Sequence, residues 1–447
     1  MAERSVMVAA DFILTGGMDR ANYALADYLA RQGGEVHLVA HEVAHGLLGY
    51  ANVHWQRVAR PLGHDALGWG ALRRAGMRAA KAAGAGARVF VNGGNCPWPD
   101  VNWVHYLHAA YFAPVEGPLP RRVWQRLKHR RALADEQEAL RRARVVIANS
   151  EATRDEIISR LGVPPERVHT VYYGTDAQEL RPITAGDRAA ARAALGWEAE
   201  RRVVLFVGAL GDRRKGFDTV LAAWQQVCAD PGWEADLVVV GRGSELEAWR
   251  RRTIDWRGTP PGYAGRPAYA QPAGDPREPR PAGAAPLRLP GSGRRSEFRG
   301  LLASNLPTVQ TARPPRASDA ALAPQVRFLG RRDDVPRLLA ASDLMVAPTR
   351  YEAYGLAVHE AWARELPALV SAAAGVAELC PPQLRAQLLL DDPEDATALA
   401  ARLRAWHQNP GAFAEWMPEL GPHLRAHSWD DMAAAIVRLA DERETGS

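Results

Sequence analysis

Short apolar runs alternate with longer amphipathic stretches along most of the chain, and this alternation constrains the fold more than any other feature of the sequence. A short apolar run is typical of a buried parallel strand, and a longer amphipathic stretch is typical of a covering helix. The pattern therefore predicts an α/β protein built on open parallel sheets. The predicted strands are residues 6–10, 35–40, 88–92, 102–107, 145–149, 168–172, 202–207, 235–240, 325–329, 344–347 and 368–371.

The predicted strands fall into two groups, with a boundary near residues 178–200. A chain of 447 residues is long enough for two or three domains, each with its own core. We expect one doubly wound, Rossmann-like unit over residues 1–180 and a second over residues 181–427. The stretch from Ser428 to the end reads as a capped final helix.

Residues 255–324 do not follow this alternation. The segment holds 13 of the 32 prolines of the chain, with many Gly, Arg and Ala residues and no sustained period. Prolines at this density interrupt helices and strand ladders, so the segment cannot bury enough surface to offset its ordering entropy. We interpret it as a disordered surface insertion in the second unit. A translated frame error and a basic tether are the alternatives.

Composition excludes several other classes of protein. A hydrophobic fraction of 47% and a charged fraction of 24% are ordinary for a globular protein. Cys96, Cys228 and Cys380 are widely spaced, which argues against a disulfide framework or a zinc ribbon and fits a reducing cytoplasm. No apolar run is long enough for a membrane span or a signal peptide. The net charge of +5 does not require a nucleic-acid partner, so we expect a cytoplasmic protein that binds none.

Two carboxylates flank a turn between a predicted strand and a predicted helix. Glu352 follows the strand 344–347, Gly355 lies at the turn, and Glu360 lies in the opening turns of the helix. Backbone N–H groups and the dipole at the start of a helix can hold a phosphate. A carboxylate on each side can accept hydrogen bonds from hydroxyl groups at either end of a diphosphate. The pattern therefore favours a sugar nucleotide as the ligand.

The stretch from Glu352 to Glu360 closely resembles the E-x7-E signature of the retaining glycosyltransferases of family four. That family has the GT-B fold, in which two Rossmann-like domains face each other across a cleft. The resemblance implies an acceptor domain first, a nucleotide-sugar donor domain second, and a final helix 428–447 that packs back on the first. It also implies that Glu352 contacts the donor sugar and Glu360 the ribose, with Tyr354, Gly355 and Leu356 beside the donor.

A pair of glycines follows the first predicted strand. Gly16 and Gly17 permit close approach of the backbone, and the helix that they open favours an anion. By itself this pattern also fits a simple strand–helix turn. Family-four enzymes carry such a loop at the interdomain cleft. The resemblance implies that Gly16 and Gly17 face the donor diphosphate and that Asp19 lies near the reacting sugars or the acceptor.

Three successive cations follow the predicted strand 202–207. Arg213, Arg214 and Lys215 precede Gly216 in a loop that resembles the family loop in which an Arg and a Lys neutralise the leaving diphosphate. Lys215 matches that pattern, whereas the Arg expected six residues earlier is Ala209. Either Arg213 or Arg214 can supply the missing charge. The alternative is a solvated run of surface charges.

Two histidines lie near the end of the predicted strand 102–107. His105 and His108 are placed where open α/β sheets bind ligands. The family has a His near this place that contacts the donor sugar, and His108 is the better match. His105 points to a different face, which fits a core residue.

The string His41-Glu42-Val-Ala-His45 matches the H-E-x-x-H motif of zinc proteases. That chemistry needs the string within one helix together with a third ligand. Here the string follows a strand, and Ala51 stands where an extended motif has its third His. We therefore set the protease interpretation aside and expect neither a metal nor another cofactor.

The basic helix predicted to start at Pro120 carries Val123, Trp124 and Leu127 among its arginines. This composition fits peripheral contact with an anionic membrane, or else a solvated or acceptor-facing helix. The resemblance as a whole implies sugar transfer from a nucleotide diphosphate to a hydroxyl of a glycan, a lipid or a small molecule, with retention of configuration. A sugar-nucleotide epimerase or phosphorylase of the same fold, and a catalytically degenerate carbohydrate-binding protein, are the alternatives.

Overall fold

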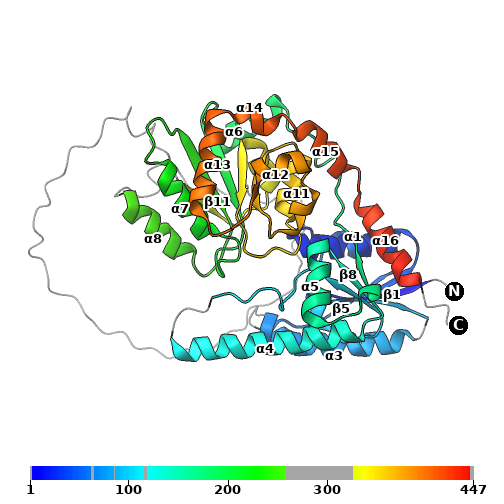
Figure 1. The fold of residues 1–447 in the computed structure, drawn as a ribbon. Helices are drawn as coiled ribbons and strands as arrows, with labels where there is room; N and C mark the ends of the chain where they lie inside the picture. Colours follow the sequence, from blue (N-terminus) through cyan, green and yellow to red (C-terminus); the bar gives the residue numbers. More distant parts are fainter. Residues whose placement is uncertain (1–2, 62–64, 85, 115–117, 258–325, 443–447) are drawn as a thin grey trace, which may run out of the picture.

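The computed structural model describes residues 3–442 apart from residues 62–64, 85, 115–117 and 258–325. These residues form two lobes, each built on a parallel sheet with helices packed against it (Figure 1). The prediction of an α/β fold with two Rossmann-like units is therefore confirmed. Most of the predicted insertion lies outside the described residues, and its first three residues, 255–257, belong to a helix instead.

The first sheet has seven parallel strands in the order β5-β3-β1-β6-β7-β8-β9. Sequential strands are added outward from β1 in both directions, which is the doubly wound arrangement with a switch point beside β1. The strands are β1 (Arg4–Val8), β3 (Glu35–Ala40), β5 (Val53–Arg57), β6 (Arg88–Asn92), β7 (Val101–Val104), β8 (Val145–Ala148) and β9 (Val168–Thr170). A separate two-stranded pair joins β2 (Asp11–Phe12) to β4 (Glu42–Val43).

Helices cover both faces of this sheet, because its strands are apolar on both sides. They are α1 (Gly17–Arg31), the short α2 (His45–Leu48), α3 (Asp65–Ala83), α4 (Leu119–Arg142) and α5 (Glu151–Leu161), with 3-10 turns at η2 (Gly93–Asn95) and η3 (Pro165–Arg167). In Figure 1, α3 and α4 run along the outer side of this lobe, and α4 extends beyond the sheet beneath the other lobe.

The second sheet has six parallel strands in the order β12-β11-β10-β13-β14-β15. They are β10 (Arg202–Val207), β11 (Ala235–Val240), β12 (Val326–Gly330), β13 (Leu344–Ala347), β14 (Ala368–Ser371) and β15 (Leu389–Leu390). The helices are α6 (Ala185–Leu195), α7 (Phe217–Val227), α8 (Leu246–Arg257), α10 (Val335–Ala341), α11 (Leu356–Ala363), α12 (Pro382–Leu388), α13 (Ala396–Gln408), α14 (Pro410–Ala414) and α15 (Met417–Arg425), with the 3-10 turn η4 (Gly375–Leu379).

The last helix, α16 (Trp429–Asp441), lies against α1 on the first lobe (Figure 1). Ser428 caps its start in a capping box with Asp431, which satisfies two backbone groups that a helix end leaves open. Met432 and Ile436 are fully buried in the core of the first lobe. The final helix therefore ties the end of the chain to the lobe that contains its beginning.

Candidate functional site

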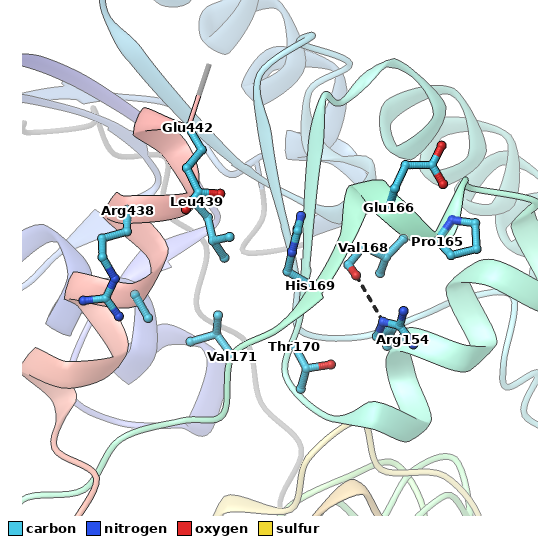
Figure 2. Close-up of a pocket in the computed structure, with 11 residues that line it drawn as sticks. Arg154, Pro165, Glu166, Val168, His169, Thr170, Val171, Arg438, Leu439 and Glu442 are labelled. Carbon is cyan, nitrogen blue, oxygen red and sulfur yellow. Dashed lines mark hydrogen bonds between the residues drawn. The ribbon is translucent and has the colours of Figure 1, made fainter. Parts of the chain in front are cut away.

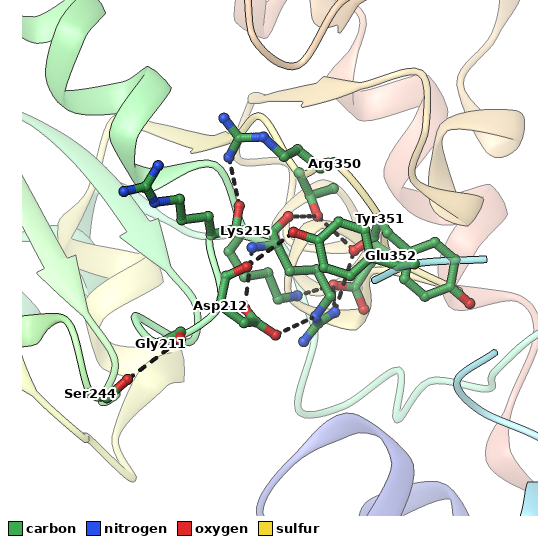
Figure 3. Close-up of polar contacts among 11 residues, drawn as sticks. Gly211, Asp212, Lys215, Ser244, Arg350, Tyr351 and Glu352 are labelled. Carbon is green, nitrogen blue, oxygen red and sulfur yellow. Dashed lines mark hydrogen bonds and ion pairs between the residues drawn. The ribbon is translucent and has the colours of Figure 1, made fainter. Parts of the chain in front are cut away.

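Two loops meet at the carboxyl edge of the second sheet and bring opposite charges together. Lys215, at the end of the loop after β10, donates a hydrogen bond to the Glu352 carboxylate in the loop after β13 (Figure 3). The Arg214 Nη1 atom lies 3.2 Å from the same Glu352 Oε2 atom. Burial by itself would raise the pKa of Glu352, but Lys215 and Arg214 outweigh it and hold the pKa below its ordinary value. Glu352 is therefore ionised at neutral pH.

An arginine clamp fixes the two loops relative to each other. Arg350 donates from Nη1 and Nη2 to the two carboxylate oxygens of Asp218, each at 2.8 Å, in the bidentate geometry that guanidinium groups favour. The amide of Arg350 also donates to the carbonyl oxygen of Arg214 at 2.8 Å. Gly216 closes the cation loop at φ +71°, and a Cβ atom there would lie 1.8 Å from the carbonyl oxygen of Pro348. Only glycine fits at this position.

The glycine pair of the first lobe lies on the start of α11. Gly355 precedes that helix at φ +111°, and a Cβ atom on Gly17 would lie 3.5 Å from the Cβ atom of Leu356. Gly16 is held at φ +96° directly before α1. The Gly16–Gly17 loop and the N-terminus of α11 therefore face each other between the lobes.

Beside this contact the described residues enclose a cavity of about 30 Å³, lined in part by Lys215, Glu352 and Gly355. Sites for small molecules usually enclose about 300 Å³ or more. The cavity has room for a water molecule or two but not for a nucleotide. The lining residues of this cavity all belong to the second lobe, and Lys215 and Glu352 form their ion pair beside Gly355.

Glu360 faces the first lobe from α11. Its Oε1 atom lies 3.2 Å from Nη1 of Arg20, and Nη2 of the same arginine lies 2.6 Å from Glu179. The Arg20 guanidinium also lies 5.5 Å from the centre of the Trp429 ring. Burial raises the pKa of Glu360, and Arg20 opposes that rise without cancelling it. Arg20 thus joins α1, the segment after β9, α11 and α16.

His108 lies in the loop after β7, at the edge of the same site. Its ring is 5.0 Å from that of Tyr106, and the Tyr106 ring in turn lies 5.6 Å from the Arg214 guanidinium. Burial, with His129 and Lys128 nearby, lowers the pKa of His108 to about 4, so the ring is neutral at pH 7. The other histidine, His105, is a core residue whose ring contacts the Tyr173 hydroxyl, and burial lowers its pKa to about 3.

Asp19 occupies the first turn of α1. Its charge and that of Glu352 both act on the buried Tyr173 hydroxyl, whose pKa burial raises in the first place. Both carboxylates therefore lie near Tyr173, Asp19 in the first lobe and Glu352 in the second.

Two of the predicted site side chains point away from Glu352 and its cations. Arg213 has positive φ at 54° and directs its guanidinium to Glu245, at 3.8 Å, rather than to Glu352. Tyr354 is 2% exposed, and its hydroxyl bonds the Nδ1 atom of His359 at 2.6 Å within the packing against the first lobe. The choice left open between Arg213 and Arg214 therefore falls geometrically on Arg214, and Tyr354 can face a ligand only through its backbone.

The H-E-x-x-H string is divided among different elements. His41 is buried and its Nδ1 atom lies 2.9 Å from the Val58 carbonyl oxygen, Glu42 belongs to β4, and His45 begins α2. A zinc protease needs both histidines on one face of one helix, which this geometry does not provide. Among the residues that the structure describes, no group of three or more His, Cys, Asp or Glu side chains is arranged to hold a metal ion.

A larger hollow, of about 470 Å³, lies away from this site at the edge strand β9, between α5 and α16 (Figure 2). Arg154, His169 and Arg438 are among its lining residues. Its lining includes none of the residues that the sequence predicted to be catalytic or donor-binding. The volume of a hollow therefore does not identify the candidate donor site in this protein.

Both halves of the chain match families of known proteins. Residues 15–179 match Glycosyltransferase Family 4, and residues 294–409 match Glycosyl transferases group 1. A D-inositol 3-phosphate glycosyltransferase of Rhodococcus jostii is 26% identical over 302 residues, which are 68% of this chain and 53% of that protein. The chain therefore spans about half the length of this curated relative.

Solved structures with the same architecture cover nearly the whole chain. Sucrose-phosphate synthase from Thermosynechococcus elongatus superposes with a TM-score of 0.65 at 19% identity, over 98% of each chain. HepE from Anabaena, solved in complex with UDP and glucose, superposes with a TM-score of 0.63 at 17% identity, over 99% of this chain and 100% of its own. At these identities the likeness shows the fold alone.

The two facing Rossmann-like lobes, with a charged site where the carboxyl edge of the second sheet meets the first lobe, define the GT-B fold. Two glycosyltransferase family models match separate parts of the chain, one in each lobe, and together they support a glycosyltransferase of family four.

Proposed function

We propose that the protein is a retaining glycosyltransferase that moves a sugar from a nucleotide diphosphate to a hydroxyl acceptor. The observation that carries the proposal is the ion pair of Glu352 with Lys215 and Arg214, opposite the Gly16–Gly17 loop. A diphosphate beside Gly355 replaces Glu352 as the partner of the two cations. The freed carboxylate then accepts hydrogen bonds from the hydroxyls of the donor sugar.

The leaving diphosphate is stabilised by fixed charges and dipoles. Lys215 and Arg214 supply two positive charges, and the clamp between Arg350 and Asp218 holds their loop in place before the donor arrives. The backbone N–H groups of Gly355 and Leu356 add the partial positive charge of a helix start. Such groups act most strongly when they need no reorganisation during the reaction. The proposal therefore assigns diphosphate stabilisation to protein groups and needs no metal ion.

The remaining residues orient the hydroxyl groups. Glu360 accepts from the ribose hydroxyls, which displace Arg20 from its carboxylate. His108, neutral at pH 7, bonds a hydroxyl of the donor sugar, and Asp19 lies on the acceptor side. The acceptor oxygen bonds to the anomeric carbon on the face from which the diphosphate oxygen leaves. Its proton passes to that leaving oxygen, so the configuration is retained and no covalent enzyme intermediate forms.

The first test uses a panel of UDP-, ADP- and GDP-sugars in thermal unfolding. The correct donor is expected to raise the melting temperature, because a ligand that binds only the folded state stabilises it. Glu360→Ala is expected to weaken donor binding by about tenfold, since a pair of lost hydrogen bonds to a charged group costs roughly 1.5 kcal/mol or more. The exposed Glu415→Ala serves as the matched control and is expected to bind like the wild type.

The same panel of nucleotide sugars also distinguishes a transferase from an epimerase or a phosphorylase of the same fold. With an acceptor present, a transferase releases nucleotide and forms a glycosylated product. An epimerase interconverts the sugar without releasing nucleotide, and a phosphorylase requires inorganic phosphate. A protein that binds a nucleotide sugar but yields no product with any hydroxyl acceptor would contradict the proposal.

We further propose that the exposed first half of α4 contacts an anionic membrane that presents the acceptor. Leu119, Val123, Trp124 and Leu127 are 70%, 46%, 55% and 59% exposed, and they recur at helical spacing along one side. Arginines are interspersed among them at positions 121, 122 and 126. Apolar side chains with flanking cations suit the boundary between acyl chains and anionic headgroups. None of the described helices is long and apolar enough to cross a membrane.

Co-sedimentation with vesicles tests this surface. Wild-type protein is expected to bind phosphatidylglycerol vesicles and not phosphatidylcholine vesicles. The double substitution of Arg122→Glu with Arg126→Glu is expected to weaken binding by about tenfold or more, because each basic residue near an anionic surface contributes about 1 kcal/mol. The double substitution of Arg78→Glu with Lys81→Glu on α3 reverses two exposed charges on the same lobe and controls for net charge. Equal binding by the α4 variant and this control would contradict the proposed surface.

A further inference from the structure

A buried carboxylate on α4 holds the loop that carries His108. Glu136 is 0% exposed, and its Oε1 and Oε2 atoms accept hydrogen bonds from the amides of His108 at 2.8 Å and Ala109 at 3.0 Å. Among the described residues, no salt bridge reaches this carboxylate, so the two amides are its partners. Burying a carboxylate costs free energy unless hydrogen bonds or an opposite charge compensate for the lost hydration, and here the two amides supply the hydrogen bonds.

The same loop is held from the opposite lobe. The amide of Leu107 donates to the Tyr351 hydroxyl at 2.9 Å, and Tyr351 directly precedes Glu352. The Tyr111 hydroxyl donates to the carbonyl oxygen of Asp212 at 3.0 Å, and its ring stacks on that of Tyr351 with centroids 6.0 Å apart. Three consecutive amides, 107 to 109, are thus fixed by one group of the second lobe and by Glu136 of the first.

Tight packing leaves Glu136 little freedom to find other partners. A Cβ atom on Gly94 would lie 3.0 Å from the amide nitrogen of Glu136, so η2 lies directly against this turn of α4. The titratable side chains whose pKa the charge of Glu136 raises are Tyr106 and Tyr351. From α3, Arg73 is engaged by the neighbouring Asp135 and Glu138 of α4, at 3.2 and 2.7 Å.

We propose that Glu136 is a positioning residue for sugar transfer, which holds the His108 loop through a two-oxygen grip on consecutive amides. This inference rests on the proposed function, because it takes His108 as the group that contacts the donor sugar. Each carboxylate oxygen receives one N–H group, and the loop backbone has no equivalent partner within its own segment. An amide at this position offers one acceptor oxygen and turns an N–H donor toward the other amide.

The grip depends on the charge of Glu136. Burial raises the pKa of Glu136 to about 7, and the two amide hydrogen bonds only partly oppose that rise. Above this pH the carboxylate accepts from both amides. Below it, a proton occupies one oxygen and weakens the grip, so transfer is expected to fall by up to tenfold per pH unit. His108 does not produce this change near pH 7, because its pKa lies well below that at about 4.

The test combines hydrogen exchange with transfer rates in the full-length protein. At pH 8, amides 108 and 109 are expected to be protected in the wild type and to lose at least tenfold of that protection in Glu136→Gln. The variant is also expected to transfer sugar about tenfold or more slowly and to lack the limb near pH 7. Glu138→Gln, on the same helix and paired with Arg73, removes a neighbouring carboxylate and is expected to behave like the wild type in both measurements.

The outcomes separate this inference from the proposed function. If Glu136→Gln keeps wild-type protection and the same pH limb, the positioning role is overturned. If the variant does not fold, hydrogen exchange in the wild type tests the positioning role instead. The role is overturned if the protection factors of amides 108 and 109 stay constant from pH 8 to pH 6. Loss of protection in the variant, in a protein that turns over no nucleotide sugar, supports the anchoring of the loop and overturns the proposed function.

Discussion

Lys215→Ala is expected to lower kcat for sugar transfer by about 10²- to 10³-fold, because a fixed charge aimed at a developing anion is among the largest contributions to catalysis. Lys215 lies at the carboxyl edge of the second sheet, and its ammonium group reaches the carboxylate beside Gly355. In the proposed reaction, the diphosphate acquires its extra negative charge at this place as the bond to the sugar breaks. The measurement is kcat at saturating donor and acceptor.

Thermal unfolding is measured beside kcat, because Lys215→Ala leaves the partly buried Glu352 with Arg214 as its remaining cation. The pKa of Glu352 is then expected to rise toward its ordinary value, since Lys215 contributes the largest of the opposing effects. Lys81→Ala removes an exposed lysine from α3 and controls for the loss of one charge. A rate for Lys215→Ala within threefold of this control would contradict the assigned role.

Residues that follow a strand could be predicted from the sequence, because parallel strands end at one edge of a sheet. Glu352 follows β13 and Lys215 follows β10, and these two strands are neighbours in the second sheet. Their meeting therefore requires only the strand assignment and the topology of an open α/β sheet. The close approach of Gly17 to Leu356 follows from the same rule applied to two facing sheets.

Contacts between the lobes could not be predicted in this way. Arg20 meets Glu360 across 340 positions of sequence, and Tyr351 meets the amide of Leu107 across 244. Neither pairing has a local pattern, because each depends on how the lobes close. The sequence also did not predict a role for Glu136, because a glutamate in a charged helix is usually solvated. It is buried here only because α4 runs beneath the loop that carries His108. Motif position also did not reveal that Tyr354 turns its ring toward Tyr173, 4.7 Å away.

Strands could be predicted from the sequence where they are fully buried, and less well at the edges of a sheet and at the ends of strands. Strand β11 is buried at every residue, and its predicted and observed bounds coincide. Strand β5, Val53–Arg57, was missed because its sequence alternates polar and aromatic residues and only Val53 is buried. The strand predicted to reach residue 107 ends at Val104, because the amides beyond it bind Tyr351 and Glu136 in place of a sheet partner.

Glu352→Gln is expected to change nucleotide binding and turnover in opposite directions. Removing the carboxylate releases Lys215 and Arg214 from their ion pair, so a nucleoside diphosphate no longer competes with Glu352 for these cations. We expect the affinity for the free nucleoside diphosphate to rise by about fivefold, which corresponds to roughly 1 kcal/mol. The kcat for transfer is expected to fall by about 10²-fold, because the amide cannot replace a charged acceptor for the sugar hydroxyls.

Calorimetry with UDP, ADP and GDP, beside steady-state rates, measures both changes. The pKa of Glu352 is held below its ordinary value, so the competing ion pair is present throughout the neutral range and is lost only when the pH falls through that lowered pKa. The difference in affinity is therefore expected to be constant between pH 6 and pH 8. Glu245→Gln removes a carboxylate that pairs with Arg213 instead and is expected to change neither quantity. Weaker binding of every nucleoside diphosphate by Glu352→Gln would contradict the competition, because it would mean that the carboxylate supports the cations more than it occupies them.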